Sequence, residues 1–491
     1  MQWVGGGGSA LVFRIVSYLL YCVVCLAMFR VARLTLPLAA AFAAAALFAV
    51  HPVHVEAVAM AVNQGELWVA LLSCIAVFRY VSARRAGGAL RISTTAGLGA
   101  LYLLACFFKE NAVVLPGLLV AAELFLVPTE APARVRVRQT RFLYLLLMML
   151  AIGFLSVRTA VLGGNVRGTA IAEALEPQGV GGRLLTMLTV VPEWFRLLLW
   201  PAHLQGDYSP QEIVAQNSWV TADTLGVLLL VGAVIAAVAA RRRAPAITFG
   251  LAWCAIALFP VHNVLVPTGI VLAERTLLLP SIGAMLALGG LGALLLERAE
   301  PGAQRGLAVA TGLLLILGVY RSTTRHPVWS DQFNYWYVTA NHDAPLSYRA
   351  HHALAEMYVL ANADGKAEQE YRLSIALAPP NVSTVFLAYA NRLRLKGHCY
   401  PAAELYRRSL AIAPAVQPVR ASLVACLIDL GKYQEALQEA AIGLASGDEP
   451  ATWRWLQQAA DSALKAGAPA GSVHLTPPSD STASLKTGTG Q

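Results

Sequence analysis

Charged residues are scarce in this sequence. Only 13% of its 491 residues are Asp, Glu, Lys or Arg, whereas 57% are hydrophobic, and the mean hydropathy is +0.58. A soluble globular protein carries about 25% charged residues. The shortage of charge therefore excludes an ordinary soluble protein and indicates that much of the chain lies in lipid.

Cysteine is also sparse, and the seven cysteines are scattered along the chain. Cys22 and Cys25 form a C-x-x-C pair inside an apolar run, with no second pair and no histidine partner. This is weak evidence for a redox or metal site, so we expect no metal and no bound cofactor. The net charge of +9 comes from basic residues between apolar runs, which indicates membrane topology rather than nucleic-acid binding.

Apolar runs fill most of the first 325 residues and predict about ten membrane-spanning helices. They lie at about 10–30, 35–50, 66–82, 94–108, 111–127, 142–162, 222–240, 245–266, 269–296 and 305–321. Five short connections between them are rich in arginine and begin at Arg30, Arg84, Arg134, Arg241 and Glu297. The positive-inside rule places all five on the cytoplasmic side.

The remaining connections and the C-terminal third then lie on the opposite, periplasmic or lumenal face. The first span would run from outside to inside, and no signal peptide precedes it, so we expect a missing upstream span and an N-terminally truncated sequence. The semi-apolar stretch Leu184 to Trp200 cannot cross the membrane singly. We expect it to be a re-entrant or surface-lying helix on the outer face.

A polar stretch, His51-Pro-Val-His54-Val-Glu56, interrupts two apolar runs on this outer face. Pro52 cannot donate a backbone hydrogen bond and disfavours helix at His51, so the chain bends there. Ionisable groups at membrane depth are costly and often functional. One interpretation is a binding site, and the alternative is an interfacial turn with capping residues.

The character of the sequence changes at about Ser347 to a repeating helical pattern. Ala355 and Ala390 are 35 residues apart, and Ala402 and Ala436 are 34 apart. This period, with small residues at helix contacts, predicts three tetratricopeptide (TPR) repeats at 346–379, 381–414 and 416–449, with a capping helix at about Ala451 to Ala466. The expected domains are a membrane domain (1–325), a linker (326–345), TPR repeats (346–466) and a disordered tail (467–491).

Several motifs resemble those of the transmembrane-and-TPR protein O-mannosyltransferases, a family of GT-C-type membrane glycosyltransferases. They begin at His51, Lys109, Asn263, Ala273, Arg325 and Ser347 and occur in order along nearly the whole chain. The resemblance implies an all-α protein, with a polytopic GT-C-like membrane domain followed by a C-terminal TPR α-solenoid. It also implies transfer of a sugar, mannose in this family, from a polyprenyl- or dolichyl-phosphate donor to Ser or Thr hydroxyls on the outer face.

This chemistry requires a base for the acceptor hydroxyl and cations for the lipid phosphate. Glu56 is the candidate catalytic residue. The candidate substrate-binding residues are His51, His54, Lys109, Glu110, Arg158, Arg196, Glu274 and Arg275. For Lys109-Glu110 and Glu274-Arg275, the alternative is a local ion-pair network that fixes loop shape. The expected partners are membrane lipid, the lipid-linked sugar, and an acceptor polypeptide or protein partner in the TPR groove.

The sequence departs from the family at several positions. The family's first outer loop, which carries its acidic catalytic residues, is absent from this sequence. Arg14, Ser17 and Tyr21 stand where the family usually has His, Asn and His, and Gln64 stands where it often has Arg. We therefore expect this chain to transfer sugar weakly or not at all. The alternative function is a non-catalytic membrane-anchored TPR scaffold; a lipid-sugar transporter is disfavoured because the two halves show no internal symmetry. The alanine-rich composition favours a bacterial inner membrane over an endoplasmic-reticulum membrane, with the TPR domain periplasmic or lumenal.

Overall fold

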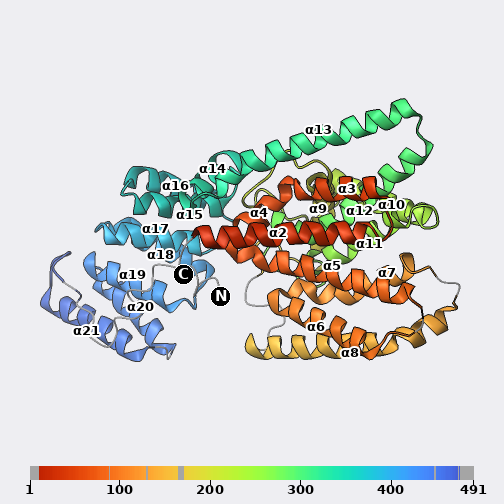
Figure 1. Cartoon of the computed structure of the whole chain (residues 1–491). Helices are drawn as coiled ribbons and strands as arrows, with labels where there is room; N and C mark the ends of the chain where they lie inside the picture. The colour runs from red at the N-terminus through yellow and green to blue at the C-terminus, as the bar shows by residue number, and fades with distance from the viewer. Residues whose placement is uncertain are drawn as a thin grey trace. The chain divides into compact units, whose positions relative to one another are not determined.

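The computed structural model describes residues 10–87, 89–128, 131–163, 171–446, 449–473 and 475. In these residues it contains twenty α-helices, seven short 3-10 or π segments and no strand, which confirms the all-α class. The chain divides into two compact units between Pro345 and Leu346. We describe each by itself, as the membrane unit and the C-terminal unit (Figure 1).

The membrane unit consists of helices joined by mostly short connections. They are α2 (Ala10–Ala32), α3 (Leu38–Ala49), η1 (Pro52–His54), α4 (Val55–Ala59), η2 (Ala61–Asn63), α5 (Gln64–Arg85), α6 (Ile92–Phe108), η3 (Glu110–Val114), α7 (Leu115–Phe125), α8 (Ala133–Val161), α9 (Val180–Leu199), α10 (Thr221–Ala240), α11 (Pro245–Leu258), η4 (Phe259–Val261), η5 (Glu274–Leu277), α12 (Leu278–Arg298), α13 (Pro301–Arg325), η6 (His326–Trp329), α14 (Gln332–Val338) and η7 (Thr339–Asp343). The last three occupy the segment that the sequence suggests as a linker.

The ten apolar runs are all helical, but they are not ten full-length spans. Six described helices are long and apolar enough to cross a membrane, and a seventh span results if α3 and the segment from Pro52 to Ala59, bent by 47°, are counted together. α3 has 12 residues and α7 has 11, which is about 18 Å or less against a hydrocarbon core of about 30 Å. Such short helices cross lipid only with the help of their flanking segments.

Close packing of α11 on α12 holds the end of the unit that carries Glu274 and Arg275. Gly250 and Gly283 face each other there, and a Cβ atom on either would clash with the carbonyl oxygen of the other. Small residues permit this backbone contact between membrane helices. The indole of Trp253 on α11 donates a hydrogen bond to the Leu279 carbonyl on α12 (2.8 Å), which fixes the register of the pair.

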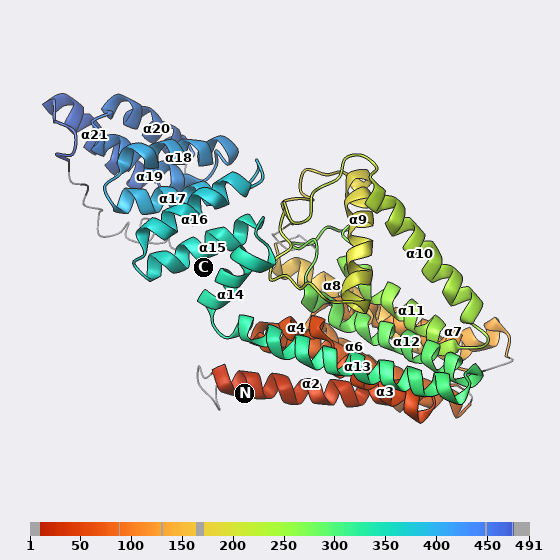
Figure 2. The same ribbon diagram turned by 90° about the horizontal axis from the view of Figure 1, so that it is seen from above.

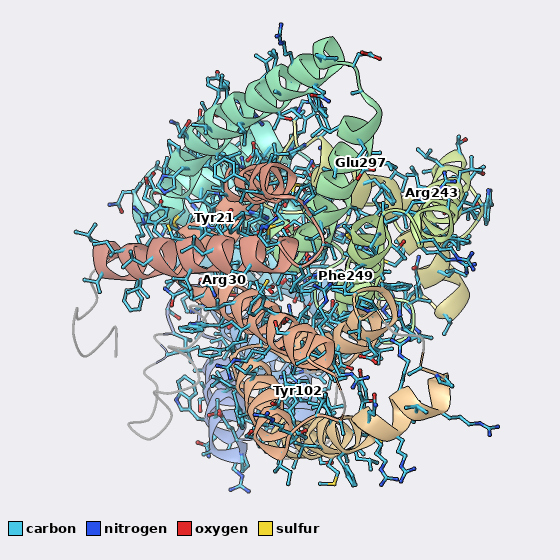
Figure 3. The ribbon with its side chains drawn as sticks, turned by 45° about the vertical axis from the view of Figure 1, so that its right-hand side comes forward. Tyr21, Arg30, Tyr102, Arg243, Phe249 and Glu297 are labelled. Carbon is cyan, nitrogen blue, oxygen red and sulfur yellow. The ribbon has the colours of Figure 1, made fainter. Side chains whose placement is uncertain are left out.

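The arginine-rich connections lie together at one end of the membrane unit. Figures 1 and 2 show the α7–α8, α10–α11 and α12–α13 connections at the right-hand end, and α4 and α14 at the other end. Arg85 ties the α2–α3 turn to the same end, because its guanidinium donates to the carbonyls of Leu34 and Leu126. In Figure 3, Arg243 and Glu297 lie toward the right of the unit and Tyr21 toward the left. We call these the arginine end and the polar end.

Helix α9 contains the stretch expected to be re-entrant or to lie on the surface. It packs against α10, buries Met187, Val191 and Trp194, and carries Pro192 in its interior. It is not among the six span candidates found in the described residues. Its placement relative to a bilayer stays a prediction.

The C-terminal unit is a series of helix pairs with a final helix. They are α15 (Tyr348–Leu360) with α16 (Asp364–Leu377), α17 (Thr384–Leu395) with α18 (Cys399–Ile412), α19 (Gln417–Asp429) with α20 (Tyr433–Ala445), and α21 (Pro450–Ala466). Each pair falls within one repeat expected from the 34-residue period, and neighbouring pairs pack in series.

Small residues and glycine turns explain the regularity of these pairs. Ala355, Ala390 and Ala402 are fully buried at helix contacts. Gly397 and Gly431 have φ angles of 78° and 71° between the helices of the second and third pairs, a conformation that favours glycine. The assignment of the pairs as TPR repeats with a peptide groove stays a prediction. The expected disordered tail lies largely outside the described residues, as do Met1 to Ser9.

Candidate functional site

The polar stretch after α3 folds into a compact turn that directs Glu56 into the protein. Pro52 begins η1 as expected from its fixed φ, and the Nδ1 atom of His51 accepts a hydrogen bond from the Val53 amide (3.4 Å). α4 follows for five residues and ends at an extended Met60. The Asn63 side chain then donates to the Glu56 carbonyl (3.2 Å), which closes the turn before α5 begins.

Glu56 binds Arg275 across the membrane unit. One carboxylate oxygen accepts a hydrogen bond from the Arg275 backbone amide (2.8 Å), and the other forms an ion pair with the Arg275 Nη1 atom. The Glu56 side chain is 4% exposed and the Arg275 side chain 25% exposed. The carboxylate therefore holds one edge of the guanidinium from inside, while part of the guanidinium remains accessible.

A second buried carboxylate, that of Glu66, binds the segment from Lys109 to Asn111. Its two oxygens accept hydrogen bonds from Lys109 Nζ (2.6 Å) and from Asn111 Nδ2 (2.7 Å). Glu66 also lies close enough to Arg275 to interact with its charge. The structure thus joins the 51–66, 109–111 and 274–275 segments. We call Glu56, Glu66, Lys109, Glu274 and Arg275 the polar-end cluster.

Glu274 points into the loop before α10 rather than toward its sequence neighbour. Its Oε1 atom accepts hydrogen bonds from the Gln205 amide (2.6 Å) and from the Tyr208 hydroxyl (3.2 Å). Burial, together with the nearby carboxylate, raises the pKa of Tyr208 well above its usual range, so the phenol keeps its proton as a donor. The Glu274 Oε2 atom is buried and has no partner among the described residues.

The segment after α13 contributes to the same region. Arg325 forms an ion pair with Asp343 and interacts with the charge of Glu274. The Tyr335 hydroxyl donates to the Gly206 carbonyl (2.7 Å), and its pKa is raised by burial and by the charge of Glu56. Sequence reasoning missed Arg325 and Tyr335 as site residues. The signal was present, because Arg325 to Asp331 is one of the motifs that carry the family resemblance.

The two histidines of the turn lie behind the polar-end cluster. His54 bridges Tyr21 (2.7 Å from Nδ1) and Ser281 (2.8 Å from Nε2). His51 Nδ1 accepts from Val53, so its Nε2 is the donor toward the Leu198 carbonyl (3.1 Å). Both rings are buried.

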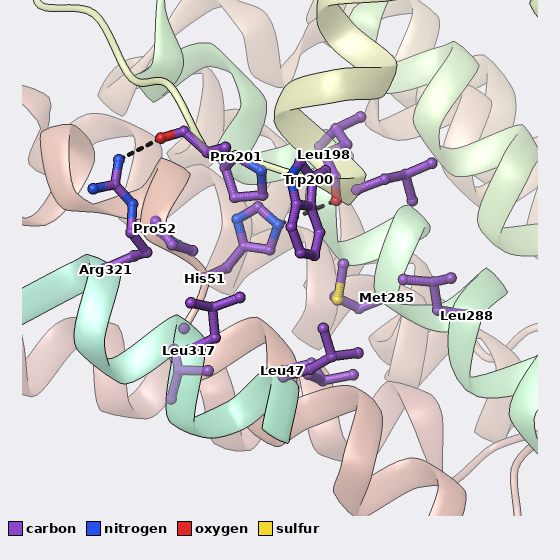
Figure 4. A pocket seen from close by; sticks show the side chains of 15 residues that line it. Leu47, His51, Pro52, Leu198, Trp200, Pro201, Met285, Leu288, Leu317 and Arg321 are labelled. Atoms are coloured by element: carbon purple, nitrogen blue, oxygen red, sulfur yellow. Dashed lines mark hydrogen bonds between the residues drawn. The ribbon is translucent and has the colours of Figure 1, made fainter. Parts of the chain in front are cut away.

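A cavity of about 320 Å³ opens beside His51 (Figure 4). It is lined mainly by apolar side chains of α3, α9, α12 and α13, with Trp200 and Arg321 at its rim. Arg321 donates to the Ala202 carbonyl, so the loop after α9 is tied to α13 at this point. His51 therefore contacts a largely apolar cavity rather than an ion pair.

Two expected phosphate-binding arginines have separate partners. Arg158 at the end of α8 is 3.7 Å from Glu110, and both side chains are partly exposed. Arg196 on α9 pairs with Glu193 (2.7 Å) and donates to the His203 carbonyl (2.7 Å), and it lies near Tyr208. Both cations form ion pairs with carboxylates from other segments, Lys109 with Glu66 and Arg275 with Glu56. Whether these pairs only fix the shape of the loops or also bind substrate stays a prediction.

The positions that depart from the family contact one another or the site. Gln64 donates to Ser17 Oγ (2.9 Å), so these two positions form a neutral pair. Tyr21 binds His54, and Arg14 donates to the carbonyls of Trp329 and Ser330 (3.0 and 2.9 Å). The departures are therefore mutually compatible in the fold.

The chain is similar to several curated protein O-mannosyl-transferases. A protein O-mannosyl-transferase of Caenorhabditis elegans is 25% identical over 69% of this chain and 46% of its own length. The protein O-mannosyl-transferase Tmtc3 of Drosophila melanogaster is 25% identical over 66% of the chain and 41% of its own length. TMTC3 of Mus musculus is 23% identical over 86% of the chain and 53% of its own length. These homologues support the TMTC protein O-mannosyl-transferase family for this chain.

The chain spans about half the length of the curated relatives it matches. No protein-family model matches it, and no solved structure matches it. The relatives named here are eukaryotic, so they do not support the bacterial inner membrane that the composition favours. The apolar helices do identify a membrane protein.

Proposed function

We propose that this chain is a membrane glycosyltransferase that moves a sugar from a polyprenyl- or dolichyl-phosphate donor to Ser or Thr hydroxyls of proteins. The names of its relatives support glycosyl transfer and suggest mannose as the sugar. The reaction takes place at the polar end, on the periplasmic or lumenal face. The C-terminal unit then binds the acceptor polypeptide or a partner protein in the groove expected of TPR repeats.

The arrangement of Arg275 carries this proposal. Glu56 binds its backbone amide and its Nη1 atom, while Nε and Nη2 have no partner among the described residues. A guanidinium presents five donors in a fixed plane, so one edge can be anchored while the other binds two phosphate oxygens. Glu56 thereby sets the direction in which the free edge points. A lipid phosphate at the membrane rim is the ligand that suits this edge.

Sugar transfer breaks the bond between the sugar and the donor phosphate, so negative charge develops on the phosphate. Arg275, with Lys109 nearby, stabilises that charge if the phosphate lies against the polar-end cluster. The acceptor hydroxyl must lose a proton as the new bond forms. Glu56 as the base stays a prediction, and in this structure both its oxygens are bound to Arg275, which suits a positioning role.

Because both carboxylate oxygens of Glu56 already bind Arg275, the arrangement also favours a second candidate function, a non-catalytic membrane-anchored scaffold. In a scaffold the polar-end cluster only ties its three segments together. The two functions differ in whether Arg275 binds the donor. They therefore make opposite predictions for the same variant.

Donor binding by Arg275→Ala tests the proposal. Charge-assisted hydrogen bonds contribute about 1.5 to 3 kcal/mol, so we expect roughly a tenfold or greater loss of affinity for a polyprenyl-phosphate sugar. Arg305→Ala, an exposed arginine at the start of α13, is the matched control and should bind normally. Both variants are compared at equal folded yield in one detergent. Unchanged donor binding in a folded Arg275→Ala protein would support the scaffold.

A further inference from the structure

A groove lies between α7 and α8 near the arginine end, far in the structure from the polar-end cluster. It has a volume of about 480 Å³. Its lining includes Val120, Leu124, Val137, Arg141, Leu145 and Met148. The five apolar members are 42–64% exposed, so the groove opens to the surroundings of the helices. Since α8 is a span candidate, those surroundings are lipid.

The groove has the depth of one leaflet. From Val137 to Met148 the helix rises by about 16 Å, which is about half of the roughly 30 Å hydrocarbon core. An acyl chain that enters beside Met148 can therefore run along α8 as far as Arg141. The groove is mainly apolar along this length. At the end nearest the membrane surface it is lined by Arg141 and by Arg136, which binds the Glu123 carboxylate that also lines the groove.

Arginines crowd that end of α8. Arg134, Arg138 and Arg141 are spaced by four and three residues, so they share one face of the helix. The described residues offer none of these three a carboxylate within 4 Å, whereas Arg136 binds Glu123 (3.1 Å). The first turn of α8 contains no acidic residue, although a helix N-terminus favours negative charge. An external anion would therefore be stabilised by these arginines, with no nearby acidic residue of the first turn to repel it.

We propose that this groove binds one anionic phospholipid. Its phosphate lies against Arg141, which lines the groove, and against Arg138, one turn away on the same face of α8. One acyl chain runs from there along Leu145 and Met148. Basic pockets between membrane helices on the cytoplasmic side bind anionic headgroups in this way, and the cytoplasmic leaflet supplies such lipids. Charge complementarity selects the headgroup, and the apolar groove distinguishes a lipid from a soluble phosphate. The proposal does not depend on the glycosyltransferase function.

Native mass spectrometry of the purified full chain tests the site, with phosphatidylglycerol as the anionic probe and phosphatidylcholine as the neutral one. We expect Arg138→Gln with Arg141→Gln to weaken phosphatidylglycerol binding by about thirtyfold, or roughly fivefold for each arginine. Arg241→Gln with Arg242→Gln removes the same charge from the same end of the unit, at residues that do not line this groove. This control pair should retain binding.

A second pair of variants tests the groove itself. Val137→Trp fills it and leaves every arginine in place, so it should reduce binding of phosphatidylglycerol. Val135→Trp, two residues away and also exposed, lies outside the lining and should have no effect. Equal losses for the two arginine pairs would overturn the proposal in favour of general electrostatic attraction. Full binding by Val137→Trp, or equal binding of glycerophosphoglycerol without acyl chains, would overturn the lipid assignment.

Discussion

The two ends of the membrane unit each contain a buried carboxylate bound to arginine, but the two arginine side chains differ in how much of each remains accessible. At the arginine end, Glu123 accepts hydrogen bonds from Arg84 (2.9 and 3.0 Å), from Arg136 (3.1 Å) and from the Tyr80 hydroxyl (2.9 Å). At the polar end, the Glu56 carboxylate binds Arg275 and no other described residue, and the Arg275 side chain is 25% exposed. Arg84 is only 3% exposed.

This comparison shows how similar residues acquire different roles. Glu123 is enclosed by donors from α5 and α8, so its carboxylate is satisfied within the protein and the arrangement ties the helices together. The Glu56–Arg275 pair is closed on the carboxylate side and open on the guanidinium side. A buried ion pair is weak evidence for stability alone. The accessible hydrogen-bonding capacity is what separates a candidate site from an internal tie.

Membrane topology provides the largest contrast between the two ends. We predict that the polar end and the C-terminal unit lie on the non-cytoplasmic side, because the arginine-rich connections share the opposite end. A periplasm-active reporter fused after Gly467 should be active, and one fused after Arg242 should be inactive. Strong activity from the Arg242 fusion would reverse the assignment of the two ends.

Removal of each carboxylate should give unequal losses of stability. Glu123→Gln leaves Arg84 buried without its counter-ion, and loss of one partner of a buried pair costs about 3–5 kcal/mol. Glu56→Gln should destabilise the protein less, because Arg275 can reach water. Unfolding in detergent measures both, with the exposed Glu297→Gln as control. A larger loss for Glu56→Gln would mean that the polar-end pair is the main structural tie.

The contact between Ser17 and Gln64 should give the smallest effect. A neutral hydrogen bond contributes about 0.5–1.5 kcal/mol, and this one is partly buried at the polar end. A double-mutant cycle with Ser17→Ala and Gln64→Ala should give a coupling free energy in that range when unfolding is measured. Strict additivity would show that the two departures from the family are unrelated.

Much of the fold follows from sequence pattern. The apolar runs become helices, Pro52 bends the chain, and the 34-residue period gives the bounds of the C-terminal helix pairs. The number of full-length spans was less predictable, because hydropathy finds α3 and α7 without showing that they are short. These helices depend on neighbouring segments, which is a property of packing.

The candidate site was predictable as a set of residues but not as a set of pairs. Glu56 and Arg275 are 219 positions apart, and only the packing of α4 against η5 brings them together. The sequence allowed an ion-pair network at Glu274-Arg275 and Lys109-Glu110, but it did not show that Arg275 and Lys109 would bind the distant carboxylates of Glu56 and Glu66. In the sequence, Arg84 and Arg136 belong to arginine-rich connections that indicate the cytoplasmic side. The neighbouring sequence did not indicate that Glu123 would form ion pairs with both of them.

The most direct test compares Arg275→Ala with Arg84→Ala in one detergent, with donor-lipid affinity and unfolding measured on each. We predict that Arg275→Ala loses about tenfold or more in affinity with little change in stability. Arg84→Ala should lose about 3–5 kcal/mol in stability while its folded fraction binds the donor normally. Normal donor binding by Arg275→Ala, or an equal loss of donor affinity in both variants, would contradict the assignment of the lipid phosphate to the polar end.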